Sequence, residues 1–147
     1  MKKYIHDLIH DFLLCGVTGW CMEILFTALF SLRRRDFKLR GTTSIWMFPI
    51  YGSAILLVPV MKLLRKKPAW FRGLTYMTLI FSAEYTAGFL LDRHSLCPWD
   101  YCRSKFNIKR FIRLDYAPNW FVAGLLFEYL LNHKKSSLPS GHSNQGA

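Results

Sequence analysis

Residues 8–32 read LIHDFLLCGVTGWCMEILFTALFSL and form the longest of four apolar blocks in this 147-residue chain. A helix that crosses a bilayer needs roughly 20 mostly apolar residues, within a range of about 17 to 25. The other blocks cover residues 43–64, 70–91 and 116–132, and the last is the shortest. Basic runs at residues 33–35 and 65–67 separate the first three. The sequence therefore predicts an all-α integral membrane protein, a four-helix bundle with short basic loops.

These blocks also set the domain organisation. Residues 1–135 are expected to form one four-span membrane domain, and the polar residues 136–147 a disordered tail. The first block is expected to be retained and not cleaved as a signal peptide, because it is long and carries Glu23.

Prolines interrupt the second block. Pro49, Gly52 and Pro59 lie inside it, and a proline within a helix removes a backbone hydrogen bond and clashes with the preceding turn. The stretch around Pro49 to Gly52 is therefore predicted to be a kink or a break in the second helix.

The net charge of +11 raises the question of nucleic acid. No motif for nucleic-acid recognition accompanies it, and the basic residues lie in loops and at helix ends, where they meet anionic lipid head groups. The lipid bilayer is therefore the expected partner. With four spans, the 20 Lys and Arg divide into nine on one side and eleven on the other. The positive-inside rule needs an imbalance, so the orientation stays open.

All three glutamates, Glu23, Glu84 and Glu128, lie inside the apolar blocks. A carboxylate in hydrocarbon costs on the order of 3 kcal/mol even on lenient insertion scales, and by default it marks a functional site. No Lys or Arg lies well inside a block to neutralise them, and Tyr85 is adjacent to Glu84. The glutamates are predicted to form a proton or cation site, or to hold helices together by polar contacts.

Helical spacing refines this prediction. Gly16, Gly19, Trp20 and Glu23 step by three or four along one helix face, and small residues on such a face let another helix approach closely. Spans one and three run in the same direction, so Glu23 and Glu84 are expected at similar depth. Glu128 lies near the end of its block, where it is closer to the membrane surface.

The four cysteines give no metal site. Cys15 and Cys21 are expected to pack in the first span, and Cys97 and Cys102 lie in the longest loop. A disulfide between these two is expected only if that loop faces an oxidising compartment. Neither pair has the spacing of a zinc site, so no metal and no cofactor are predicted. Trp99 and neighbouring Tyr residues in this loop suit an aromatic belt at the membrane surface.

Four short motifs follow one another along the chain. They are Gly19-Trp20-x-x-Glu23, Pro49-Ile50-Tyr51-Gly52, Glu84-Tyr85-x-x-Gly88, and Trp99-Asp100-Tyr101 with Phe106-Asn107. In this order they resemble the transmembrane protein 229 family, whose bacterial relatives are labelled putative ABC-transporter type IV. The resemblance covers residues 16–129, implies a small multi-pass membrane protein, and marks the motif residues as candidate site residues. The chain has no G-x-x-x-x-G-K-[ST] loop, so the transporter label implies at most a membrane partner of a nucleotide-binding protein.

Three functions remain open on the sequence. The favoured one is a structural or regulatory membrane module that packs against a second copy or another membrane protein. The alternative is a proton- or cation-coupled transporter or permease component that uses the intramembrane glutamates. An enzyme with Glu84, Tyr85, Asp100 and Tyr101 as acid–base groups is less expected, because no nucleophile is evident.

Overall fold

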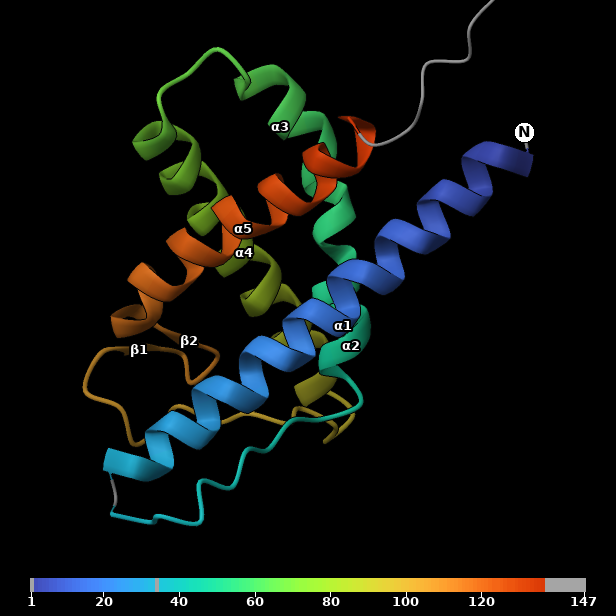
Figure 1. Ribbon diagram of the computed structural model, residues 1–147. Helices are drawn as coiled ribbons and strands as arrows, with labels where there is room; N and C mark the ends of the chain where they lie inside the picture. The colour runs from blue at the N-terminus through green and yellow to red at the C-terminus, as the bar shows by residue number, and fades with distance from the viewer. Residues whose placement is uncertain (1, 34, 137–147) are drawn as a thin grey trace, which may run out of the picture.

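The computed structural model describes residues 2–33 and 35–136, and this part of the chain is mostly helical (Figure 1). The helices are α1 (Lys2–Arg33), α2 (Met47–Gly52), the 3₁₀ helix η1 (Ser53–Leu57), α3 (Val58–Leu64), α4 (Ala69–Asp92), the short η2 (Leu114–Tyr116) and α5 (Ala117–Ser136). The predicted all-α class is confirmed. The predicted tail lies outside the described residues, except for Ser136, which ends α5.

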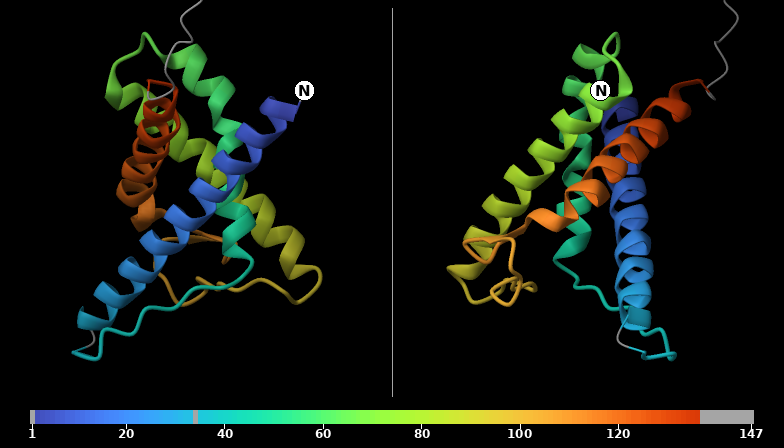
Figure 2. Two further views of the ribbon diagram at one scale, coloured as in Figure 1. Left: turned by 45° about the vertical axis from the view of Figure 1, so that its right-hand side comes forward. Right: turned by 90° about the vertical axis from the view of Figure 1, so that its left-hand side faces the viewer.

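Two helix pairs build the bundle. In one pair α1 packs against α2 and η1, and in the other α4 packs against α5. Contacts of α2 with α4 and of α3 with α5 join the pairs. The start of α1, the α3–α4 connection and the end of α5 lie at one end of the molecule (Figure 2). The α1–α2 and α4–α5 connections lie at the opposite end.

Glycines let the paired helices come close, as the stripe on α1 predicts. A Cβ atom added at Gly19 would lie 2.1 Å from Cγ of Tyr51, and one added at Gly124 would lie 2.5 Å from Cβ of Tyr76. Both tyrosines are buried in the core, together with Cys15 and Phe127. Small residues at these contacts therefore set the distance between helices within each pair.

The second predicted helix is broken, although not at the predicted place. Pro49 lies in the first turn of α2, where a backbone N–H has no helical partner to lose. The break is the 3₁₀ stretch η1, which precedes Pro59. The N–H of Val58 bonds to the carbonyl of Ile55 in a tighter turn, and this carbonyl is the one that the missing N–H of Pro59 cannot reach.

The second helix also begins later than the predicted block, at Met47 and not at residue 43. The segment that precedes α2, residues 42–46, has no helical structure and runs back along α1. The hydroxyl oxygen of Thr27 accepts a hydrogen bond from the N–H of Thr42 at 2.9 Å. The indole N–H of Trp20 donates to the carbonyl of Ser44 at 3.0 Å. Side chains of α1 thus supply the hydrogen bonds that a helix would have supplied.

A compact loop joins α4 to α5. It contains a hairpin of β1 (Asn107–Ile108) and β2 (Ile112–Arg113), paired antiparallel with Asn107 opposite Arg113. Phe111 at the turn is buried, and it contacts the position where a Cβ at Gly88 would lie, at 3.0 Å. The loop is therefore anchored to α4.

Two helical stretches are long and apolar enough to cross a membrane, Lys3–Leu32 in α1 and Met47–Leu64 across α2, η1 and α3. They correspond to the first two predicted spans. Helices α4 and α5 have 24 and 20 residues and carry Arg72, Glu84, Asp92 and Glu128. The predicted spans 70–91 and 116–132 both fall on these helices, apart from Tyr116 in η2.

Candidate functional site

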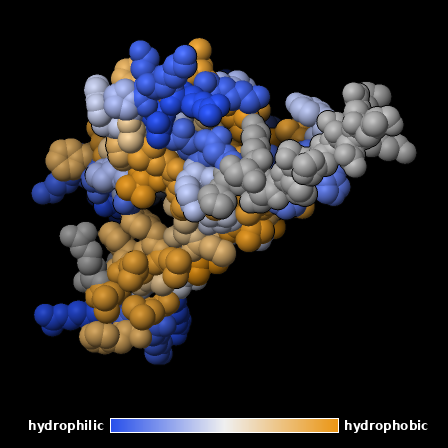
Figure 3. Space-filling view, turned by 45° about the horizontal axis from the view of Figure 1, so that its top comes forward, coloured by the Kyte–Doolittle hydropathy of each residue, from blue (hydrophilic) through white to orange (hydrophobic). Residues whose placement is uncertain are grey.

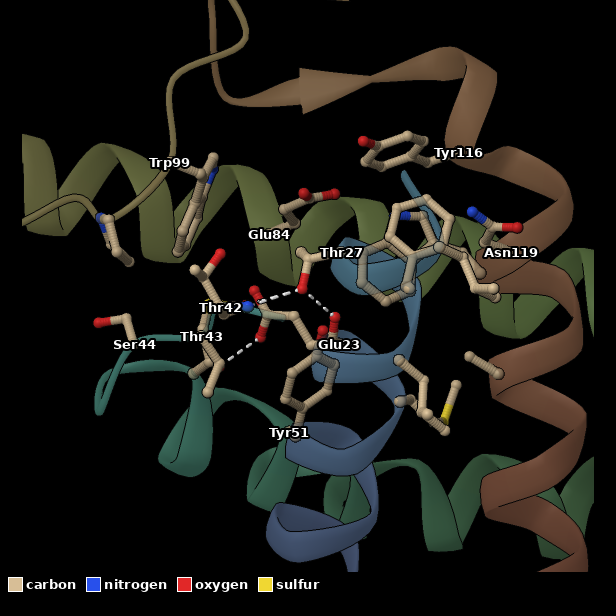
Figure 4. A pocket seen from close by; sticks show the side chains of 18 of the residues that line it. Glu23, Thr27, Thr42, Thr43, Ser44, Tyr51, Glu84, Trp99, Tyr116 and Asn119 are labelled. Atoms are coloured by element: carbon tan, nitrogen blue, oxygen red, sulfur yellow. Dashed lines mark hydrogen bonds between the residues drawn. The ribbon is translucent and has the colours of Figure 1, made fainter. Parts of the chain in front are cut away.

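A cavity of about 710 Å³ lies between the two helix pairs. Its walls come from α1, the segment before α2, α2 itself, α4, the α4–α5 loop and α5. Most of the lining is apolar or aromatic, and two carboxylates, Glu23 and Glu84, point into it (Figure 4). Cavities of about 300–1,000 Å³ with apolar walls and a few polar groups are typical small-molecule sites.

Glu84 projects into the cavity from the middle of α4, and only 8% of this residue is exposed. Its Oε1 accepts a 3.3 Å hydrogen bond from the hydroxyl of Tyr101. Its Oε2 is buried and has no hydrogen-bond partner within residues 2–33 and 35–136. The indole Nε1 of Trp120 lies close to this carboxylate but does not reach hydrogen-bond geometry. Glu84 therefore presents a buried acceptor to the cavity.

Glu23 reaches the same cavity from α1. Its Oε2 accepts a 2.8 Å hydrogen bond from the hydroxyl of Thr43, in the segment that runs back along α1. The helix carbonyl of Glu23 accepts from Thr27 at 2.8 Å. Glu23 and Glu84 thus line one cavity as two carboxylates that come from different helix pairs.

The α4–α5 loop closes one side of the cavity with aromatic side chains. Trp99 lines it and donates from Nε1 to the carbonyl of Phe111 at 3.1 Å. Tyr101 lines it beside Glu84, and its ring meets that of Tyr116 edge to face at 5.8 Å. Burial raises the pKa of the Tyr101 phenol, and the charge of Glu84 raises it further, so Tyr101 stays a donor.

Glu128 belongs to a different place in the structure. It lies on α5, is 7% exposed and pairs with Arg72 at the start of α4, with Nε to Oε2 at 3.1 Å. The prediction that no basic residue neutralises the three glutamates is wrong for this one. The pairing follows from the antiparallel packing of α4 and α5, which brings the start of one helix to the end of the other.

Several other predicted site residues have structural contacts away from the cavity. Tyr85 follows Glu84 on the helix, points to another face and packs edge to face on Phe111 at 5.8 Å. Asp100 is exposed and accepts from the N–H of Cys102 at 2.9 Å, which closes a turn. The side-chain amide of Asn107 donates to the carbonyl of Ser104 at 2.6 Å, and its oxygen accepts from the N–H of Arg110 in the hairpin turn at 3.3 Å.

The remaining motif residues pack around the site. Trp20 anchors the segment before α2, and Tyr51 lines the cavity from α2. Gly19 makes room for Tyr51, Gly52 for Phe12, and Gly88 for the loop aromatics. Sequence reasoning did not place four further lining residues at the site, Thr43, Tyr116, Asn119 and Trp120. They come from irregular segments, or from a helix face for which the sequence pattern does not show which other helix packs against it.

The donor set does not resemble a metal centre. In the described part of the chain, no three His, Cys, Asp or Glu side chains gather in a group that could hold a metal ion. The four cysteines, all within that part, are free thiols, and the Cys97 thiol donates to the carbonyl of Trp99 at 3.2 Å.

A helical chain with two stretches long and apolar enough to cross a membrane is compatible with a small membrane protein. The chain matches the family described as Putative ABC-transporter type IV over residues 11–143, and it belongs to that family. This confirms the part of the sequence resemblance that concerns the bacterial relatives. No solved structure matches the chain.

The Arg72–Glu128 pair gives a direct stability test. Replacing Arg72 by Met leaves a buried carboxylate without its ion partner, and we expect the free energy of unfolding to fall by on the order of 3 kcal/mol. Adding Glu128→Leu should restore most of this loss, because neither charge is then left buried alone. Reversible unfolding of the purified protein in detergent measures both.

Arg110→Met is the matched control, because Arg110 pairs with Asp92 at an exposed position. We expect it to cost less than about 1 kcal/mol. A double variant that is less stable than Arg72→Met alone contradicts this account of the pair.

Proposed function

We propose that this chain is a multi-pass membrane protein in which α1, the α2–α3 stretch, α4 and α5 each cross the bilayer. At 1.5 Å per residue, α4 is about 36 Å long and α5 about 30 Å, against a hydrocarbon core of about 30 Å. On the face shown in Figure 3, hydrophilic groups gather toward the two ends and hydrophobic residues lie between them. Successive connections between the helices lie at opposite ends of the molecule, and this supports the same arrangement.

The cavity is the basis of the proposed activity: it binds a positively charged solute, as the membrane component of a transport system. The observation that carries this is Glu84, a buried carboxylate that lines a large cavity and has one oxygen without a hydrogen-bond partner in the described part of the chain. An intramembrane carboxylate that faces a cavity is expected at a substrate or ion pathway. Family membership, with its transporter description, supports the same class of function.

A structural or regulatory module remains the second candidate. The first half of α1 exposes apolar residues four positions apart, Ile5, Ile9, Leu13 and Val17. Such a face suits a second copy of the chain or a larger membrane protein as well as it suits lipid. In that case the cavity would hold part of the partner and not a solute.

The finer resemblance to the transmembrane protein 229 family is also a proposal. Its support is that motif residues far apart in sequence meet in space. Gly19 contacts Tyr51, and Glu84 contacts Tyr101. Gly88 contacts Trp99.

Labelling of single cysteines tests whether α4 crosses the bilayer. One variant keeps Cys102 and replaces the other three cysteines by Ala, and the second adds Lys66→Cys and Cys102→Ser. In sealed membrane vesicles, an impermeant maleimide should label the two sites to complementary extents, because they lie at opposite ends of α4. Full labelling of both, or protection of both, contradicts the four-span arrangement.

Cation binding is tested by thermal unfolding of the purified protein in sodium, potassium and ammonium chloride. We expect at least one cation to raise the midpoint, since a ligand at a hundred times its Kd adds about 2.7 kcal/mol of stability. Glu84→Gln should abolish the shift, and it also controls for ionic strength.

Glu128→Gln is the matched carboxylate control and should keep the cation response, because Glu128 does not line the cavity. If no cation stabilises the parent protein, or if Glu84→Gln responds as the parent does, the proposed cation site is wrong.

A further inference from the structure

The cavity has an acidic end and an apolar opening. Its residues Leu25 and Leu29 on α1 and Val122 on α5 line it while remaining 64%, 63% and 62% exposed. They therefore mark an apolar opening of the cavity to the outer surface between α1 and α5, in addition to exposed lining residues such as Thr43 and Pro98 at its other edges. If the helices span the bilayer as proposed, this opening faces lipid and not water.

Within the described part of the chain, the acidic end of the cavity holds carboxyl groups and no basic side chain. Two carboxylates line the cavity, and no Lys or Arg is among the residues that line it. Arg113 donates to the hydroxyl of Tyr116, a lining residue, but its guanidinium is paired with Asp115 at 2.7 Å. A positive ligand group is therefore favoured beside Glu84.

Aromatic rings surround the carboxylates. Tyr51 enters from α2, Trp99 and Tyr101 from the loop, and Trp120 from α5. Aromatic faces attract ammonium groups, most strongly where water is excluded. Oε2 of Glu84 has no hydrogen-bond partner in the described residues, and an ammonium group supplies both an N–H donor for it and a positive charge.

We propose that the ligand is an amphipathic ammonium ion, a primary or secondary amine with an apolar tail. Its N–H group donates to Oε2 of Glu84, within the aromatic walls and beside Glu23. Its tail lies along Leu25, Leu29 and Val122, and it enters laterally between α1 and α5. This inference rests on the proposed cation site and adds the ligand class and the route of entry.

Matched ligands test the class. The full chain is reconstituted in phosphatidylcholine nanodiscs, and binding is followed by tryptophan fluorescence. The ligands are 2-phenylethylammonium, its N,N,N-trimethyl form, the neutral alcohol 2-phenylethanol, and ammonium chloride. We expect 2-phenylethylammonium to bind about tenfold or more tightly than each of the others, because the trimethyl form loses the N–H donor, the alcohol loses the positive charge and ammonium loses the apolar tail.

Variants test the lateral route of entry and the contact with Glu84. Glu84→Gln should weaken binding of 2-phenylethylammonium about tenfold or more, and Glu23→Gln gives a second test if the first does not fold. Val122→Trp should slow binding because the larger ring fills the opening. Leu63→Trp is the control, since Leu63 on α3 is 81% exposed and does not line the cavity.

The outcomes separate this inference from the proposed function. If ammonium binds as tightly as 2-phenylethylammonium and both depend on Glu84, the cation site stands and the amphipathic class is overturned. If the alcohol binds as tightly as the ammonium ion and Glu84→Gln changes nothing, both proposals are overturned. Equal effects of Val122→Trp and Leu63→Trp overturn lateral entry.

Discussion

Withdrawing a carboxylate from water is the constraint on which the rest of this structure depends. An ionised group buried without partners costs several kcal/mol, so each of the three glutamates needs its own solution. Glu128 has an arginine, and Glu23 is half-exposed and accepts a hydroxyl bond. Glu84 is more buried than Glu23 and receives one hydrogen bond, from Tyr101. The unpartnered oxygen is the one place where a ligand with a donor group gains most by binding.

Two segments without helical structure supply the hydrogen-bond donors for Glu23 and Glu84. The stretch before α2 is held along α1 by Thr27 and Trp20, and this brings the hydroxyl of Thr43 to Glu23. The α4–α5 loop is held by the hairpin and by Phe111 under α4, and this brings Tyr101 to Glu84. The helices thus form the walls of the cavity, while the two irregular segments complete its polar end.

Helical periodicity was enough to predict that the chain is mostly helical and that the glycines of α1 contact a neighbouring helix. It could not predict the pairing of Arg72 with Glu128, because spacing within one helix does not reveal the end of its neighbour. Nor could it place Tyr101, since a long loop has no period to follow. The start of the second helix was wrong because hydropathy counts Thr43 and its neighbours as span, whereas a Gly-Thr-Thr-Ser run more often lies in a loop.

The most direct test of this account is the reactivity of the three glutamates of the unmodified protein in membranes toward dicyclohexylcarbodiimide, an apolar reagent for carboxyl groups. Peptide mapping by mass spectrometry assigns the modified residue. The account predicts modification at Glu84, protection by 2-phenylethylammonium, and little reaction at Glu128, whose carboxylate is held by Arg72. Equal modification of Glu84 and Glu128, or modification of Glu84 that no cation reduces, would contradict a ligand-accessible carboxylate in the cavity.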